Sequence, residues 1–239
     1  MKKYKKYIVM FLIVILIFGT YYFFKSDKIN YIALGDSLAE GMNPYGEVGY
    51  SYTDYLADYL NKNNKLSFYT KKHSKSGYTT TDVIKELEIN NLLKKDLRES
   101  DLVTISIGAN DFLNSINIKN LNINEILKLK DKVIPILPNI DNCIKEIRKY
   151  AKEDMIIIGY YNPIPFLFNT SGSDLDTLFA YIDDEYQKIA NKYDCTYISL
   201  YQLFKSDSSL LPNPADIHPN LEGYEKISEM IIENYENKN

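Results

Sequence analysis

Residues 30–38 read Asn-Tyr-Ile-Ala-Leu-Gly-Asp-Ser-Leu, a short apolar run that ends at a glycine and two small polar residues. A continuous apolar run of this length is typical of a strand that is covered on both faces. The serine that follows, Ser37, then falls at a strand-to-helix turn, where its hydroxyl can be exposed. We therefore predict a buried strand over Asn30–Gly35 and a candidate nucleophile just beyond its carboxyl end.

The rest of the chain alternates short apolar runs with stretches of helical period. Four further runs predict strands at Leu66–Thr70, Leu102–Ile107, Met155–Tyr160 and Thr196–Leu200. Apolar stripes predict helices around residues 52–60, 175–189 and 224–231, and capping boxes predict helix starts at Thr79-x-x-Asp82 and Ser173-x-x-Asp176. This alternation predicts a mostly parallel sheet with helices on both sides.

The first 25 residues differ from everything after them. Tyr7 to Phe24 is an uncharged run of 18 residues behind four lysines, and it ends in aromatic residues rather than the small residues of a cleavage site. We expect an N-terminal transmembrane helix with its N-terminus in the cytoplasm. The alternative is a signal peptide that is cleaved, which would release the domain. The expected organisation is a tail and anchor over residues 1–25 and one exported domain over residues 26–239.

Charge and cysteine content exclude some classes of protein. Beyond residue 25 the chain carries 23 basic and 32 acidic residues, so the domain has no global basic field to attract nucleic acid, although a local patch is still possible. Two cysteines are too few for a disulfide scaffold. Cys143 lies on the apolar side of a helical pattern, which favours buried thiols over a disulfide between Cys143 and Cys195.

Three more segments at predicted strand ends or before helices carry polar chemistry. Gly77 can leave its N–H unobstructed toward an oxyanion, and the carboxamide of Asn110 can donate to one, whereas Asp111 is better explained as a loop fastener. His218 supplies a base that works near neutral pH. The chain has two histidines, and the other one, His73, lies among lysines and is predicted to be solvated surface. So few histidines argue against a metal site built on them.

Taken together, the segments around Ser37, Gly77, Asn110 and His218 resemble the SGNH/GDSL hydrolase family over residues 30–235. The resemblance implies a three-layer α/β/α sandwich with a five-stranded, mostly parallel, flavodoxin-like sheet. It also implies Ser37 as the nucleophile and His218 as the base. Ser37 N–H, Gly77 N–H and the Asn110 amide would form the oxyanion hole. No metal or organic cofactor is implied.

One position departs from the family pattern. The family usually places an aspartate three residues before the histidine, but this chain has Ala215 there and Asp216 two residues before His218. Either Asp216 orients the imidazole through a remodelled loop or a backbone carbonyl does so, and we favour Asp216. The orienting group matters because it selects the tautomer that accepts the serine proton.

These features predict a serine esterase that acts outside the membrane on O-acylated glycans or lipids, with short acyl groups favoured. The segments Leu113–Val133 and Asn162–Ser173 follow strand ends, where they either wall a pocket or form surface loops. A hypothesis from another class is a membrane-tethered binding module with weak or lost turnover, because a fold does not by itself establish activity.

Overall fold

The computed structural model describes residues 28–115, 129–162 and 172–238, together with residues 7, 10, 11 and 13. Most of the predicted anchor, Tyr7 to Phe24, lies outside the described residues. Among the residues described, no helix is both long and apolar enough to cross a bilayer.

All five predicted strands are present and form one sheet. The strands are β1 (Ile29–Gly35), β2 (Leu66–Ser74), β3 (Leu102–Ser106), β4 (Asp154–Ile158) and β5 (Thr196–Ile198). Their order is β2-β1-β3-β4-β5, and every neighbouring pair is parallel. This is the flavodoxin-like order, and the predicted fold class of the domain is therefore confirmed.

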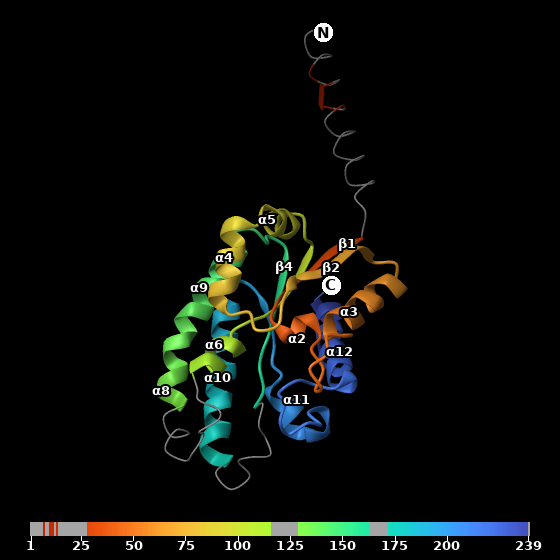
Figure 1. Cartoon of the computed structure of the whole chain (residues 1–239). Helices are drawn as coiled ribbons and strands as arrows, with labels where there is room; N and C mark the ends of the chain where they lie inside the picture. Colours follow the sequence, from red (N-terminus) through yellow and green to blue (C-terminus); the bar gives the residue numbers. More distant parts are fainter. Residues whose placement is uncertain are drawn as a thin grey trace.

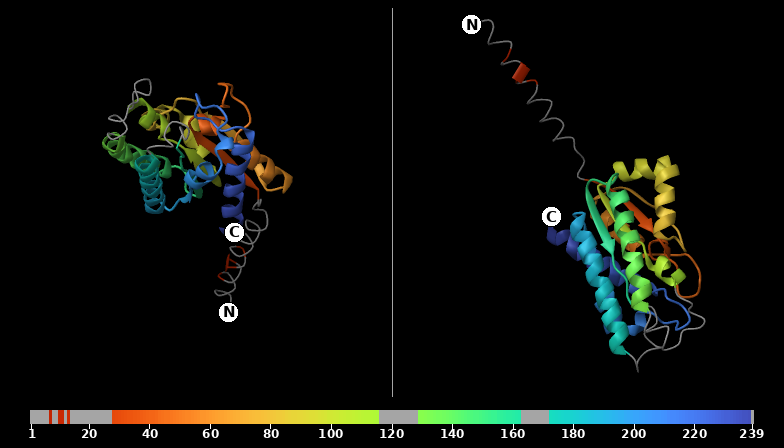
Figure 2. Two further views of the ribbon diagram at one scale, coloured as in Figure 1. Left: turned by 90° about the horizontal axis from the view of Figure 1, so that it is seen from below. Right: turned by 90° about the vertical axis from the view of Figure 1, so that its left-hand side faces the viewer.

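Helices cover both faces of the sheet, which gives three layers (Figures 1 and 2). One face packs against α4 (Thr80–Ile89), α5 (Asn91–Arg98), α9 (Leu137–Arg148) and α10 (Gly172–Lys192). The other packs against α3 (Tyr52–Lys62), α11 (Tyr201–Ser206) and α12 (Leu221–Lys238). Short elements complete the chain: α2 (Ser37–Glu40), α6 (Ala109–Ser115), α8 (Leu129–Val133) and the 3₁₀ turns Ile134–Ile136 and Ser208–Leu210.

Local sequence explains where several helices begin. Thr79 caps α4 and forms the predicted capping box with Asp82, and Ser51 does the same for α3 with Asp54. Helix α10 already begins at Gly172, so the start predicted from Ser173 is slightly late. These caps satisfy backbone N–H groups that have no partner within a helix.

One prediction about the surface is wrong. Strand β2 continues to Ser74, and its end carries His73 into the interior, where the residue is only 8% exposed. His73 Nε2 lies 2.8 Å from Asp96 Oδ2, and Lys72 Nζ lies 2.9 Å from the same oxygen. Lys71 and Lys72 concealed the end of the strand, because two lysines in succession interrupt the apolar run. The other expectation about buried groups is confirmed, since Cys143 and Cys195 are free and buried.

Candidate active site

Ser37 lies at the carboxyl edge of the sheet, next to the point where the strand order reverses between β1 and β3. Open parallel sheets bind ligands in the crevice at such a reversal. Gly35 makes the turn possible, because its φ is +148° and a Cβ there would lie 2.0 Å from the Ser106 carbonyl oxygen. The chain then enters α2 with Ser37 as its first residue.

His218 and Asp216 reach Ser37 from the loop before α12. His218 Nε2 lies 2.8 Å from Ser37 Oγ, and His218 Nδ1 lies 2.7 Å from Asp216 Oδ1. The same Asp216 oxygen accepts the backbone N–H of His218 at 2.8 Å. With the ring proton on Nδ1, the imidazole donates to Asp216 and accepts from the Ser37 hydroxyl. A carboxylate two residues before the histidine therefore reaches the ring.

Contacts from distant elements hold the His218 loop in place. The Tyr161 hydroxyl donates to the Ile217 carbonyl at 2.7 Å, and the Asn213 amide donates to the Pro44 carbonyl at 2.6 Å. Tyr224 on α12 donates to the Met42 carbonyl at 2.6 Å. Because Met42 and Pro44 follow α2, these bonds tie the loop that carries His218 to the loop that follows Ser37.

Gly77 lies in the turn before α4 and Asn110 at the start of α6, and these two segments are bonded to each other. The Asn110 side-chain amide donates to the Tyr78 carbonyl at 2.9 Å, which uses one of its two N–H groups. Asp111 accepts from the Thr80 backbone N–H at 2.9 Å and from the Thr80 hydroxyl, which is the fastening role expected of it. Asn110 lines the same pocket as Ser37.

The Gly77 turn is also tied to α2. Ser76 donates its backbone N–H to Glu40 at 2.6 Å and donates its hydroxyl to the same carboxylate. Gly77 has a φ of +84°, which favours glycine, although it does not line the pocket itself. Within residues 28–115, 129–162 and 172–238, neither the Ser37 N–H nor the Gly77 N–H has an acceptor. Among the described residues, both N–H groups are therefore unbonded.

Asp36 forms a buried network that the sequence did not indicate. Its carboxylate is 1% exposed and accepts from the Leu38 N–H at 3.1 Å, from the Ser106 hydroxyl at 3.0 Å and from the Tyr160 hydroxyl. Burial raises the pKa of Asp36 to about 6, and these hydrogen bonds oppose the rise. The available signal was an acidic residue between a buried strand and Ser37, but its partners come from strands far along the chain.

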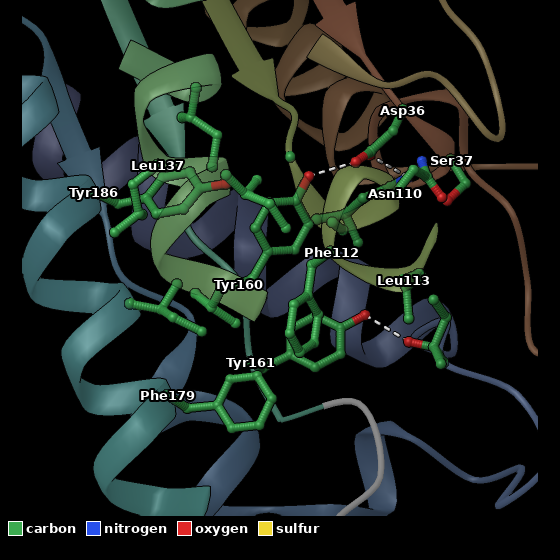
Figure 3. A pocket seen from close by; sticks show the side chains of 18 of the residues that line it. Asp36, Ser37, Asn110, Phe112, Leu113, Leu137, Tyr160, Tyr161, Phe179 and Tyr186 are labelled. Carbon is green, nitrogen blue, oxygen red and sulfur yellow. Dashed lines mark hydrogen bonds between the residues drawn. The ribbon is translucent and has the colours of Figure 1, made fainter. Parts of the chain in front are cut away.

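A pocket opens from Ser37 and His218 toward α9 and α10 (Figure 3). It contains about 780 Å³ of space, part of it open to solvent. Its apolar walls come from the start of α6, from α8 and α9, from the end of β4 and from α10. The side chains that form these walls are Phe112, Leu113, Val133, Ile136, Leu137, Ile140, Tyr160, Tyr161, Phe179, Ile182 and Tyr186.

The two segments that fitted the strand–helix alternation poorly are described only in part. Leu113 and Val133, the ends of the first segment, both line the pocket, so its described ends act as walls. Of the second segment, Asn162 and the start of α10 are described, and residues 163–171 lie outside the described residues.

A parallel sheet with a serine, an imidazole and a carboxylate joined in series at its carboxyl edge has the geometry on which serine hydrolases depend. The sequence model of the GDSL-like Lipase/Acylhydrolase family matches residues 33–226. The chain therefore belongs to the GDSL-like lipase/acylhydrolase family, and it is a carboxylic ester hydrolase of the GDSL type.

Individual relatives agree with this assignment. The chain is 26% identical over 217 residues to the uncharacterized protein YpmR of Bacillus subtilis, covering 87% of this chain and 81% of that protein. Its fold is similar to that of the lipase Lip_vut3 from a goat rumen metagenome, with a TM-score of 0.66, 21% identity and coverage of 85% and 95%. It is also similar to Axe2, an acetylxylan esterase from Geobacillus stearothermophilus, with a TM-score of 0.61, 18% identity and coverage of 85% and 92%.

Proposed function

We propose that this protein is a serine esterase in which Ser37 is the nucleophile, His218 is the general base and Asp216 orients the imidazole. The observation that carries the proposal is the contact of 2.8 Å between His218 Nε2 and Ser37 Oγ, together with the contact of 2.7 Å on the other side of the ring. Both distances are within the range required for proton transfer and for fixing the tautomer.

The reaction proceeds in two halves. Ser37 Oγ attacks the ester carbonyl carbon while its proton moves to His218 Nε2, and the tetrahedral intermediate then expels the alcohol, which takes that proton. Water next gives a proton to His218 and attacks the acyl-enzyme, and the acid leaves as Ser37 regains its proton. Asp216 stabilises the imidazolium that forms in each half.

Charge builds on the carbonyl oxygen in each half. Three donors support its stabilisation: the N–H groups of Ser37 and Gly77, which have no acceptor in the part of the chain that the structure describes, and the second N–H of the Asn110 amide. One such donor is typically worth about 3–4 kcal/mol at the transition state. Because the bonds to Glu40 and Tyr78 hold these loops before substrate arrives, the donors require little rearrangement.

The proposed setting is the outer face of a cell membrane, where residues 7–24 anchor the chain and the domain meets O-acylated glycans or lipids. The sequence supports this through the lysines before the apolar run and the aromatic residues at its end. The alternative of a binding module without turnover is less well supported, because the serine, imidazole and carboxylate are in contact at reactive distances.

Two measurements on the full-length chain test the proposal. The wild type should hydrolyse p-nitrophenyl esters and should react covalently with an alkyl fluorophosphonate at Ser37. The Ser37→Ala variant should lose both properties while it keeps its fold by circular dichroism. Labelling of the Ser37→Ala variant would identify another nucleophile, and a well-folded wild type without turnover would favour the binding module.

A further inference from the structure

We propose that the apolar pocket beside Ser37 binds the hydrocarbon chain of the acyl group, so that the preferred substrates are esters of medium- and long-chain fatty acids. This inference rests on the proposed function and names its substrate class. It reverses the preference for short acyl groups that the sequence alone favoured.

The position of the pocket is the first reason. Ser37, Asn110 and His218 all contribute to its lining, so the pocket begins where an ester carbonyl would bind. Asn110 lies at the start of α6, and the same turn of that helix provides Phe112 and Leu113. The Asn110 amide, which would bind the carbonyl oxygen, therefore belongs to the same helix as the nearest apolar wall. This arrangement places the acyl side of the ester against that wall.

The polar atoms of the walls are already used. The pocket contains three tyrosines, and each hydroxyl is bonded to the protein: Tyr160 to Asp36, Tyr161 to the Ile217 carbonyl and Tyr186 to the Ile107 carbonyl. Their rings therefore contribute hydrocarbon rather than donors to the cavity (Figure 3). Away from the catalytic edge, the described walls offer no free polar side chain.

This chemistry separates the two candidate substrate classes. A sugar that entered the pocket would bury hydroxyls without partners, at a cost of roughly 1–3 kcal/mol for each. An alkyl chain gains roughly 0.8 kcal/mol for each methylene that leaves water. An acetyl group would leave most of the walls, including the half-buried Phe112, Leu113 and Ile182, without contact. The walls therefore match an extended chain.

Helix α10 sets the far side of the pocket. Phe179, Ile182 and Tyr186 lie on one face of it, at spacings of three and four residues, opposite Leu137 and Ile140 of α9. Ile182 is the member of this face that can be enlarged, because it is half-buried and the other two are fully packed. A tryptophan at this position should shorten the pocket without touching Ser37 or His218.

The test uses p-nitrophenyl esters from acetate to octanoate with the full-length chain in isolated membranes, and membranes that contain the Ser37→Ala variant serve as the blank. The value of kcat/KM should rise roughly threefold to fourfold per methylene over the first additions, as expected from the transfer of a methylene out of water. Ile182→Trp should lower the ratio of kcat/KM for octanoate to kcat/KM for acetate at least tenfold.

Two further variants make the result specific. Ile232→Trp is the matched control, because Ile232 is also half-buried but packs against the opposite face of the sheet, and it should change neither ester. Ile182→Ala should reduce the preference for octanoate through lost contacts, without the risk of overpacking.

Several results would overturn the inference. One is a kcat/KM for acetate that equals or exceeds that for octanoate. Another is that Ile182→Trp lowers kcat/KM for octanoate and for acetate by the same factor, and Ile182→Ala leaves the ratio between the two esters unchanged. A third is a rise with the length of the alcohol in a series of alkyl acetates, which would place the leaving group in the pocket. Failure of the proposed function looks different, since no ester would then be cleaved above the blank.

Discussion

The Tyr160 hydroxyl donates a hydrogen bond to the buried Asp36 carboxylate, which joins a wall of the pocket to the residue directly before Ser37 (Figure 3). The other Asp36 oxygen accepts from Ser106 on β3 and from the Leu38 N–H in α2. An ionised carboxylate can accept all three bonds, whereas a protonated one must donate in place of one of them. The turn that presents Ser37 is therefore best ordered when Asp36 is ionised.

Loss of the Tyr160 bond should change the pH dependence of catalysis. The bond from Tyr160 lowers the pKa of Asp36, so Tyr160→Phe should raise that pKa above its present value of about 6. The acid limb of kcat against pH should move to higher pH, with a loss of severalfold to tenfold at pH 7 and partial recovery at pH 8.5. Hydrolysis rates across pH 5–9 provide the measurement.

The control for this variant is Tyr193→Phe, which also removes a tyrosine hydroxyl from a carboxylate, here Asp141 at 3.2 Å. Its profile should match the wild type. If kcat in Tyr160→Phe fell by the same factor at every pH, the variant would act through the position of the residue 160 ring. The ionisation of Asp36 would then not be the cause.

Asp36 should also make the stability of the fold depend on pH. Its folded pKa of about 6 exceeds the ordinary value of 3.8, so the folded state binds the proton more tightly than the unfolded state. This contribution to stability is complete below about pH 4 and is lost as the pH rises through 6. It amounts to roughly 3 kcal/mol, because each pKa unit corresponds to about 1.4 kcal/mol.

Asp36→Asn removes this titration. The free energy of unfolding of the wild type, relative to that of Asp36→Asn, should therefore fall by roughly 3 kcal/mol between pH 4 and pH 7. Urea titrations followed by circular dichroism suit this comparison, because the chain contains no tryptophan. A difference between the two proteins that stays constant over this range would contradict the buried, titrating carboxylate.

Asp216→Asn tests the orienting role of the carboxylate. A neutral amide cannot stabilise the imidazolium that forms when His218 takes the serine proton, so kcat should fall by roughly 10³–10⁴. Asp207→Asn is a matched control, since Asp207 also accepts a backbone N–H two residues later, at 3.0 Å, and does not contact His218. Retention of more than a tenth of wild-type kcat in Asp216→Asn would assign the orienting role to another group.

Asn110→Ala removes one proposed donor to the oxyanion and one bond to the Tyr78 carbonyl. We expect kcat to fall by roughly 10²–10³ and the free energy of unfolding to fall by about 1 kcal/mol. Asn63→Ala also removes an amide-to-carbonyl bond, of 2.9 Å to Tyr59, and should leave kcat unchanged. Full turnover in Asn110→Ala would exclude the side chain from the mechanism.

Much of the fold was predictable because β1, β3 and β4 are buried on both faces and therefore appear as largely apolar runs. The edge strand β2 was predicted to end at Thr70, because Lys71 and Lys72 interrupt the apolar run, although the strand continues to Ser74. The same two lysines explain the wrong prediction for His73, which is buried and whose partner Asp96 is 23 residues away.

The site residues that are neighbours in the sequence, or that follow a recognisable strand, were predictable. Asp216 and His218 share a loop, and Ser37 follows a recognisable strand. The network around Asp36 was not predictable, since Ser106 and Tyr160 reach it only through the register of β3 against β1 and of β4 against β3. The pocket walls were hidden for a related reason, because the apolar stripes of α9 and α10 are typical of core, and only the fold brings part of each stripe next to Ser37.

The direction of β1 bears on where an anchored enzyme could find its ester. The strand begins at Ile29 and delivers Ser37 at its far end, roughly 20 Å away at the rise of an extended strand. Four residues, 25–28, separate the apolar run from that beginning. If residues 7–24 anchor the chain as proposed, the nucleophile would lie at the end of β1 that is farther from the point of attachment.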